Sequence, residues 1–240
     1  MPLNTAGTSQ EHVNVTRPLV IVIGMPKSGT ETISQFFTCS GWSTSHWVCP
    51  LGRDFRSANS SRDLSGKVLQ SATQPACGNC MTRWITDMAG RPAGDSSASL
   101  RSACGNYDVF AQVDYEPDHT CIFPQVFHLH TLMSYLPHAC FILNTRPTNN
   151  WLRSVREWPG MMDRLTGACP IHPRNETGLG KWYDEHKERA SLALRSAQCA
   201  GEFNIEDGVG LTTHLDRFFK LNSSNTCLAK YGNKAKRSKG

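Results

Sequence analysis

The sequence predicts an α/β fold in which a central, mostly parallel β-sheet is flanked by helices. Residues 19–23 (LVIVI) and 141–143 (FIL) have the pattern of strands that are buried on both faces. Segments with helical spacing separate such runs, which is typical of α/β proteins and not of β-sandwiches or helix bundles. The chain has 240 residues, 39% of them hydrophobic and 19% charged, which fits one domain with a single core.

The first part of the chain is expected to hold an arm, two strands and a helix. Residues 1–18 are polar and are expected to form a flexible N-terminal arm. The continuous β-branched run at residues 19–23 predicts the central strand. A helix with its apolar residues on one side is expected over residues 31–39, and a second strand over residues 43–48. Residues 50–76 are rich in Ser, Gly, Arg and Asp, which predicts a long loop or insertion.

The middle of the chain is expected to continue this alternation. Helical spacing of apolar residues predicts a helix over residues 77–88, and Gly, Ser and Pro predict a loop over residues 89–106. Alternating apolar residues predict a third strand over residues 108–114. A helix over residues 125–135 then leads into the fourth strand, residues 140–145, which is buried.

The last part of the chain is expected to be mainly helical. A helix over residues 148–158 ends before a proline, and a long polar helix is expected over residues 181–199. Two glycines precede a short helix over residues 211–219. The basic tail, residues 230–240, is expected to be mobile, which leaves a single domain over residues 19–229.

A glycine-rich loop, residues 24–30 (GMPKSGT), lies between the first expected strand and the first expected helix. Glycines let the backbone turn tightly, so that successive N–H groups can point at one anion, and the N-terminus of the helix adds its positive dipole end. The alternative is a plain glycine turn with a surface lysine. This loop predicts a nucleotide-dependent group-transfer enzyme. The residues expected to bind the phosphate are Pro26, Lys27, Ser28, Gly29, Thr30 and Glu31.

The position of the lysine separates two kinds of phosphate loop. Loops that bind ATP or GTP carry the lysine directly after the second glycine, and here Thr30 occupies that place. The order Pro-Lys-Ser-Gly-Thr resembles the phosphosulfate loop of the sulfotransferase family. The resemblance covers residues 19–158. It implies a three-layer fold like that of P-loop sulfotransferases, PAPS (3'-phosphoadenosine 5'-phosphosulfate) as the donor, and transfer that needs no metal.

A second motif follows the fourth expected strand, which ends in Arg146-Pro147, with Ser154 eight residues after Arg146. This spacing resembles the family's R-x-P-x-x-x-x-x-S signature for the ribose phosphate of the donor. The planar fork of an arginine suits phosphate oxygens. The alternative is a structural salt bridge and an ordinary helix serine. We expect the two strand ends to meet in the fold and to grip opposite phosphates of one donor.

The catalytic roles are predicted from the chemistry of the transfer and from the resemblance. Lys27 is expected to stabilise the departing phosphate oxygen. Cytosolic sulfotransferases have a His after the third strand, where this chain has Asp114, and heparan-type members use a Glu where this chain has Gln35. Asp114 is therefore the first choice as general base, and burial would have to raise its pKa. His46, at the end of the second expected strand, is the second candidate.

Cysteine content bears on the compartment. Disulfides are the leading interpretation, and buried thiols or a metal site are the alternatives because His46-x-x-Cys49 and Cys77-x-x-Cys80 have zinc-like spacing. The expected location is the secretory pathway, specifically the Golgi lumen, and the alternative is the cytoplasm, because residues 1–18 contain no apolar signal core. The ten cysteines are Cys39, Cys49, Cys77, Cys80, Cys104, Cys121, Cys140, Cys169, Cys199 and Cys227. The four N-glycosylation sequons begin at Asn14, Asn59, Asn175 and Asn222.

The partners are predicted only as classes. A net charge of +5 is mild, and no basic stripe interleaved with aromatics is present, so nucleic acid is not expected. No apolar run is long enough to span a membrane. The acceptor is expected to carry a hydroxyl or an amine, with a glycan favoured by the cysteine-rich character. The rival hypotheses are a P-loop kinase or NTPase and a degenerate, non-catalytic nucleotide-binding module.

Overall fold

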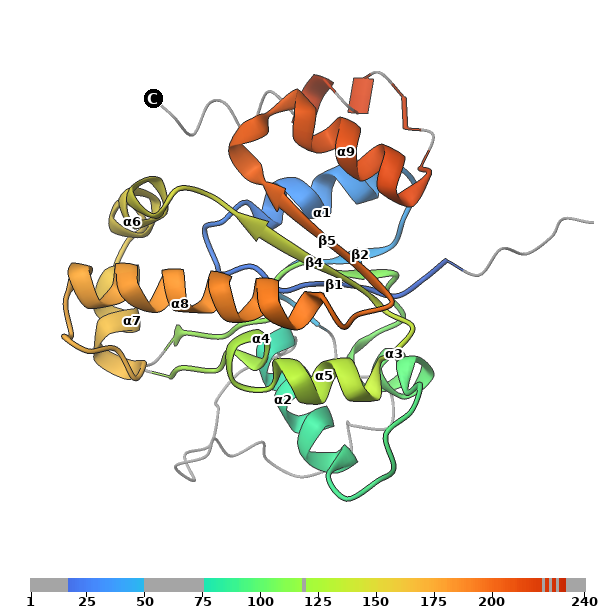
Figure 1. Ribbon diagram of the computed structural model, residues 1–240, viewed down its shortest axis with the longest axis horizontal. Helices are drawn as coiled ribbons and strands as arrows, with labels where there is room; N and C mark the ends of the chain where they lie inside the picture. Colours follow the sequence, from blue (N-terminus) through green and yellow to red (C-terminus); the bar gives the residue numbers. More distant parts are fainter. Residues whose placement is uncertain are drawn as a thin grey trace, which may run out of the picture.

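The computed structural model describes residues 17–49, 76–117, 120–221, 223–224, 226–227 and 229–231. An all-parallel, five-stranded sheet in the order β2-β3-β1-β4-β5 forms its centre (Figure 1). The α/β class and the central place of the first strand are confirmed. The strands are β1 (Val20–Val22), β2 (Thr44–Ser45), β3 (Val109–Phe110), β4 (Cys140–Thr145) and β5 (Cys199–Asn204).

Helices cover both faces of the sheet (Figure 1). Helices α1 and α9 lie on one face, and α2, α3, α5 and α8 lie on the other, while α6 and α7 lie beside α8. The helices are α1 (Thr30–Cys39), α2 (Cys77–Met88), α3 (Ser97–Cys104), α4 (Pro124–Phe127), α5 (Leu129–Tyr135), α6 (Thr148–Glu157), α7 (Met161–Ala168), α8 (Glu176–Leu194) and α9 (Val209–Phe219), with a 3-10 turn η3 (Ile205–Asp207).

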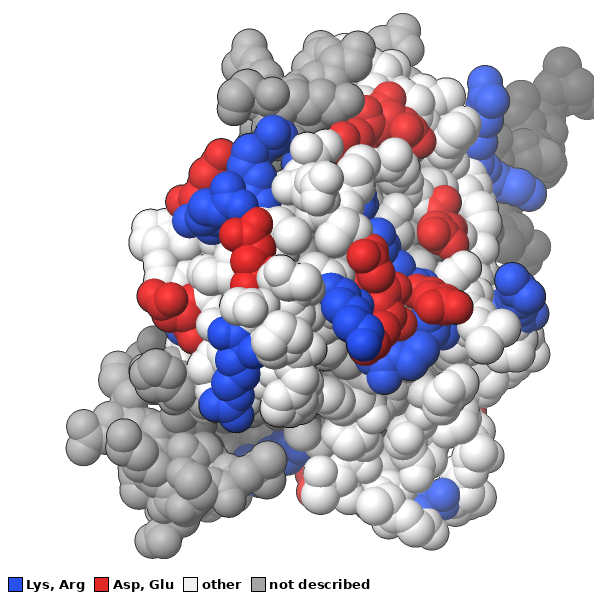
Figure 2. Space-filling model, turned by 60° about the vertical axis from the view of Figure 1, so that its left-hand side comes forward, with Lys and Arg blue, Asp and Glu red and all other residues white. Residues whose placement is uncertain are grey.

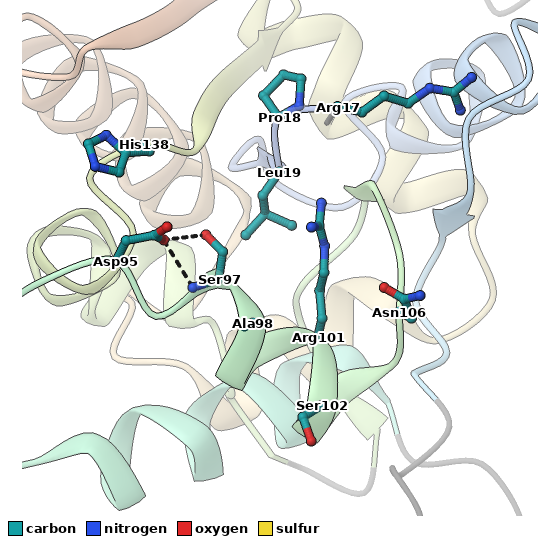
Figure 3. A pocket seen from close by; sticks show the side chains of 10 residues that line it. All are labelled: Arg17, Pro18, Leu19, Asp95, Ser97, Ala98, Arg101, Ser102, Asn106 and His138. Atoms are coloured by element: carbon teal, nitrogen blue, oxygen red, sulfur yellow. Dashed lines mark hydrogen bonds between the residues drawn. The ribbon is translucent and has the colours of Figure 1, made fainter. Parts of the chain in front are cut away.

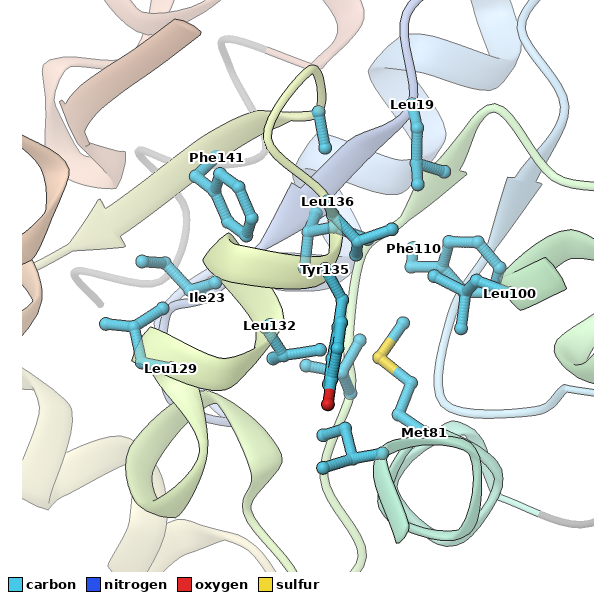
Figure 4. Packing of buried hydrophobic residues seen from close by; sticks show 14 of the residues in the cluster. Leu19, Ile23, Met81, Leu100, Phe110, Leu129, Leu132, Tyr135, Leu136 and Phe141 are labelled. Atoms are coloured by element: carbon cyan, nitrogen blue, oxygen red, sulfur yellow. The ribbon is translucent and has the colours of Figure 1, made fainter. Parts of the chain in front are cut away.

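The central strand explains the layers because its side chains alternate between the two faces. Val20 and Val22 pack with the apolar residues of α1 and α9. Ile21 and Ile23 pack with α2, α3, α5 and α8, and Figure 4 shows Ile23 beside Leu129 in this second cluster. Both faces of β1 are therefore buried, as a continuous apolar run predicts.

All five strands run in the same direction, so their carboxyl ends meet at one edge of the sheet. Residues of β1 pair with both β3 and β4, for example Val20 with Val109 and with Cys140. This pairing places the loop after β1 directly beside the residues that follow β4. Ligands of open parallel sheets bind at this edge.

Several expected boundaries were wrong. The segment 89–106, expected to be a loop, contains α3, and the expected helix over residues 125–135 is split into α4 and α5. The expected helix over residues 181–199 is displaced, because α8 begins at Glu176 and the chain then forms β5. The strand β5 went unrecognised because it is an edge strand with few apolar residues and only Phe203 fully inside. The expected loop 50–76 lies outside the described residues except for Ala76.

Five disulfides join all ten cysteines, so the disulfide interpretation is confirmed and the zinc and free-thiol alternatives are wrong. The bridge between Cys39 and Cys227 ties the end of α1 to the C-terminal region, 188 residues away. Disulfides persist in oxidising compartments. Among the described residues, no helix is long and apolar enough to span a membrane. The pairs are Cys39–Cys227, Cys49–Cys77, Cys80–Cys104, Cys121–Cys169 and Cys140–Cys199.

Candidate functional site

The glycine-rich loop connects β1 to α1 at the carboxyl edge of the sheet. Lys27 and Gly29 both have positive φ, at 66° and 94°. Gly29 is also required by packing, because a Cβ there would lie 2.2 Å from the side chain of Ile205. The loop therefore has a conformation that the sequence pattern predicts and that few residue types could share.

Side chains from β4, from α6 and from the turn between them hold three consecutive carbonyl groups of the loop. The hydrogen bonds run from Trp151 Nε1 to Pro26 O (2.8 Å), from Arg146 Nη1 to Lys27 O (3.0 Å) and from Asn144 Nδ2 to Ser28 O (2.8 Å). The N–H of a trans peptide points opposite to its carbonyl. The N–H groups of Lys27 and Gly29 consequently point away from these supporting side chains.

Helix α1 adds further donors. It begins at Thr30, and no side chain of the described residues caps its N-terminus. The first N–H groups of a helix have no partner within the helix and carry the positive end of its dipole. The loop and α1 together therefore fit a phosphate, and a donor nucleotide fits the residues present.

Arg146 lies where the sequence predicted it, against the loop. Its Nη1 bonds Lys27 O across 119 residues of sequence, so the two strand ends meet. Its side chain is 4% exposed and forms an ion pair with Glu206 at 3.3 Å. The hydroxyl of Tyr183 on α8 accepts a hydrogen bond from the backbone N–H of Arg146 at 3.1 Å. The guanidinium is thus held by Lys27 O and Glu206, and the backbone of Arg146 is held by Tyr183.

Lys27 is held much less firmly. Its Nζ lies 3.7 Å from the ring centroid of Trp158, which follows α6 and is 52% exposed. Burial lowers the pKa of Lys27, while the nearby carboxylate of Glu31 raises it. Glu31 lies on the exposed side of α1 and accepts a hydrogen bond from Gln35. The ammonium can leave the aromatic ring for a phosphate oxygen at the cost of one exposed cation–π contact.

A chain of hydrogen bonds connects the loop to both predicted base candidates. Thr30 Oγ1 lies 3.2 Å from His46 Nε2 and donates to Gln112 Oε1 at 3.1 Å. Gln112 Nε2 in turn donates to Asp114 Oδ1 at 2.9 Å. Burial lowers the pKa of His46, which keeps the imidazole neutral near pH 7. His46 contacts the loop directly, whereas Asp114 reaches it only through Gln112.

Asp114 belongs to a buried acidic pair. It is fully buried, and Gln125 Nε2 also lies 3.4 Å from its Oδ2. Burial, and then the neighbouring carboxyl of Glu116, raise the pKa of Asp114 well above the ordinary value. Burial also raises the pKa of Glu116, against the opposing effect of Arg164, whose Nη2 lies 3.6 Å away. The raised pKa that a base at this position requires is therefore present, but the carboxyl has no solvent contact.

Several residues of the site went unrecognised in the sequence, among them three that hold the loop or Arg146. Asn144 and Trp151 hold the loop, and Glu206 holds Arg146. Asn144 could have been recognised, because it is a polar residue near the end of the otherwise apolar strand 140–145. Glu206 had no such signal, because no strand was expected over residues 199–204. Ser154 lies on α6, partly buried and one turn beyond Asn150, which bonds Glu206.

Surface features elsewhere do not point to a second site. A pocket of about 720 Å³ lies at the amino-terminal edge of the sheet, and Figure 3 shows Asp95 there accepting two hydrogen bonds from Ser97. Arg101, which also lines the pocket, donates to Tyr107 O. On the face seen in Figure 2, described basic and acidic side chains are interspersed without a patch of one sign. The described residues contain no His, Cys, Asp and Glu group suited to a metal ion. The pocket is lined by Arg17, Pro18, Leu19, Asp95, Ser97, Ala98, Arg101, Ser102, Asn106 and His138.

Comparison with known families agrees with this geometry. A family model described as a sulfotransferase domain matches residues 19–173, which include the loop, both base candidates, Arg146 and Ser154. None of the curated proteins matches the chain. The matched segment contains β1 to β4 and ends before β5 and η3. Because the match covers well over half of its length, this chain belongs to the sulfotransferase family.

Proposed function

We propose that this enzyme transfers a sulfuryl group from PAPS to a hydroxyl or an amine. The observation that carries the proposal is the meeting of the loop and Arg146, which bonds Lys27 O at 3.0 Å. One phosphate position is thereby supplied by backbone N–H groups and Lys27, and a second by the guanidinium of Arg146. The donor carries two phosphate positions, and these two groups of residues follow the adjacent strands β1 and β4.

Lys27 stabilises the leaving group in this proposal. The bond between sulfur and the 5'-phosphate oxygen breaks while the acceptor oxygen or nitrogen bonds to sulfur, and negative charge develops on the phosphate. In this proposal the ammonium of Lys27 and the N–H groups of the loop would hold that phosphate. Preorganised donors of this kind stabilise the charge that develops in the transition state. Ser154 and Arg146 bind the ribose phosphate.

His46 takes the proton of the acceptor, and the geometry favours it over Asp114. Thr30 donates its hydroxyl proton to Gln112 Oε1, so it accepts from the Nε2–H of His46. In that tautomer Nδ1 carries the free lone pair of a neutral imidazole. Asp114 fixes the amide of Gln112 by accepting from its Nε2. Asp114 therefore orients the chain of hydrogen bonds, and His46 Nδ1 receives the proton.

A glycan of the Golgi lumen is the acceptor that we propose. Trp47 follows His46 directly and stacks on Tyr115 with ring centroids 6.4 Å apart and an interplanar angle of 18°. Both rings are partly exposed and offer an apolar face with a polar edge, which suits a sugar ring. The five disulfides fit an oxidising lumen. Of the four sequon asparagines, Asn175 lies within the described residues, and its exposed position fits glycosylation in that lumen.

The test is a thermal-shift assay with 3'-phosphoadenosine 5'-phosphate, and with ATP and magnesium ions in parallel. The parent chain should be stabilised selectively by the adenosine bisphosphate, and Lys27→Ala and Arg146→Ala should abolish that shift. Lys181→Ala is the matched control, because it removes a charge from the exposed side of α8.

Two results would contradict the proposal. A larger shift with ATP and magnesium would favour a kinase or NTPase. The absence of a shift with either nucleotide would favour a degenerate, non-catalytic module.

A further inference from the structure

We infer that Glu206 is a positioning residue that holds the guanidinium of Arg146 in the orientation that binds the ribose phosphate. The inference rests on the proposed function and adds a residue from outside the matched segment 19–173. Glu206 lies in η3, directly after β5, and its carboxylate pairs with Arg146. Its effect on donor binding passes through Arg146.

The contacts of Glu206 define its geometry. Its Oε1 accepts from Arg146 Nε at 3.4 Å and from Arg146 Nη2 at 3.3 Å. Asn150 Nδ2 lies 2.9 Å from both carboxylate oxygens. The carboxylate therefore engages one edge of the guanidinium, while Nη1 on the other edge reaches the carbonyl of Lys27.

Burial makes this arrangement rigid. The side chains of Arg146 and Glu206 are 4% and 7% exposed. A buried guanidinium without a counter-charge would be strongly unfavourable, and a planar fork paired along one edge has little rotational freedom. With Nε and Nη2 held by Glu206 and Nη1 held by Lys27 O, the guanidinium has one fixed orientation, which is what recognition of a phosphate requires.

The backbone around Glu206 is fixed as well. Asn204 Oδ1 accepts from the backbone N–H of Glu206 at 3.0 Å. The side chain of the neighbouring Ile205 packs so closely on the loop that it leaves no room for a Cβ at position 29, which is a glycine. Ile205 thus contacts the loop, and the next residue, Glu206, contacts Arg146.

A carboxylate near an anion site could instead compete with the phosphate for Arg146. The hydrogen bonds argue against competition, because both oxygens of Glu206 are already engaged by Asn150, which does not depend on Arg146. Asn150 and Ser154 are four residues apart on α6, so they share a face of the helix. Glu206 thus bonds Asn150, and Ser154, the predicted phosphate ligand, lies one helical turn further along α6.

The experiment measures the dissociation constants of two nucleotides for the Glu206→Gln variant by isothermal titration calorimetry. Affinity for 3'-phosphoadenosine 5'-phosphate should fall about tenfold, since a hydrogen bond to a charged group is lost or misaligned. Affinity for adenosine 5'-phosphate should change less than twofold, because this nucleotide lacks the phosphate that Arg146 binds. Glu202→Gln is the matched control, because Glu202 is an exposed residue of β5.

Selectivity between the nucleotides separates positioning from general damage. Equal losses for both nucleotides, unchanged affinities, or tighter binding of the bisphosphate would each overturn the inference, and tighter binding would indicate competition. Asn150→Ala, which removes the second support of Glu206, should shift selectivity in the same direction by a smaller factor, and it carries the test if Glu206→Gln does not fold. If the parent chain shows no preference for the bisphosphate, the proposed function itself fails.

Discussion

The two cations of the site differ in how the protein holds them. Arg146 is buried, paired with Glu206 and bonded to the loop carbonyl of Lys27. Lys27 is partly exposed, and its ammonium rests on the ring of Trp158. A fixed guanidinium suits recognition of a phosphate that keeps its charge throughout the reaction. A movable ammonium suits the phosphate on which charge develops, because its contact can strengthen as the transition state forms.

This comparison predicts different consequences for the two cations, and the largest is at Lys27. Lys27→Ala should lower kcat by roughly 10²- to 10³-fold, the usual effect of removing one donor to a developing charge. Stability should change little, because Lys27 has a single aromatic contact at the surface. Steady-state kinetics and thermal unfolding, with Lys181→Ala as control, would check both. An unchanged kcat would assign the leaving group to another residue.

The next effect in size concerns His46, which joins the loop to the proton transfer. His46→Gln should lower kcat/KM by about 10²-fold. In the parent chain kcat/KM should be constant at neutral pH and fall as the pH drops through the lowered pKa of His46, below the ordinary histidine value of 6.5. The pH profile of His46→Gln should lack this fall. Retention of the same profile would favour Asp114 as the base.

Arg146→Lys tests whether geometry matters beyond charge at the fixed cation. A lysine keeps the positive charge, but it cannot form the two hydrogen bonds that Nε and Nη2 of Arg146 donate to Glu206. The dissociation constant for the adenosine bisphosphate should rise about tenfold. The melting temperature should also fall, in contrast to Lys27→Ala, because a buried pair is disturbed. Equal effects of the two substitutions on stability would remove the distinction between the cations.

The smallest effect is expected at Asp114, behind the loop. Its folded-state pKa is raised, so its contribution to stability is greatest below the ordinary aspartate pKa and declines as the pH rises above about 4. Asp114→Asn cannot ionise, so the variant avoids this pH-dependent loss of stability. The side-chain amide of Gln125 can rotate so that its Oε1, which has no partner among the described residues, accepts a hydrogen bond from the new asparagine. The variant's melting temperature relative to the parent should increase as the pH rises from 4 to 7. A constant difference would show that burial of Asp114 carries no such cost.

The sequence predicted the features that are encoded locally. The loop between residues 24 and 30 combines a buried strand, two glycines and a helix start in one short segment, and Arg146 follows another buried strand. Their meeting followed from the parallel sheet. Lys27, Arg146 and His46 all lie at the site, and their catalytic and binding roles remain predictions.

Other features depend on contacts between distant segments. Glu206 follows an edge strand whose residues, Cys-Ala-Gly-Glu-Phe-Asn, lack the apolar pattern of a strand. Its partner Arg146 lies 60 residues earlier in the chain. The disulfide partners could likewise not be deduced from spacing, since ten cysteines allow very many pairings. Tertiary packing determines these features, and local sequence does not record them.

The most direct test of the account uses nucleotides that carry one phosphate each. We predict that Lys27→Ala weakens binding of adenosine 5'-phosphate and leaves adenosine 3'-phosphate unaffected, and that Arg146→Lys does the reverse. Calorimetric titration of both variants and the parent with the two nucleotides would measure this. Loss of affinity for the same nucleotide in both variants would show that the two strand ends do not bind opposite phosphates of one donor.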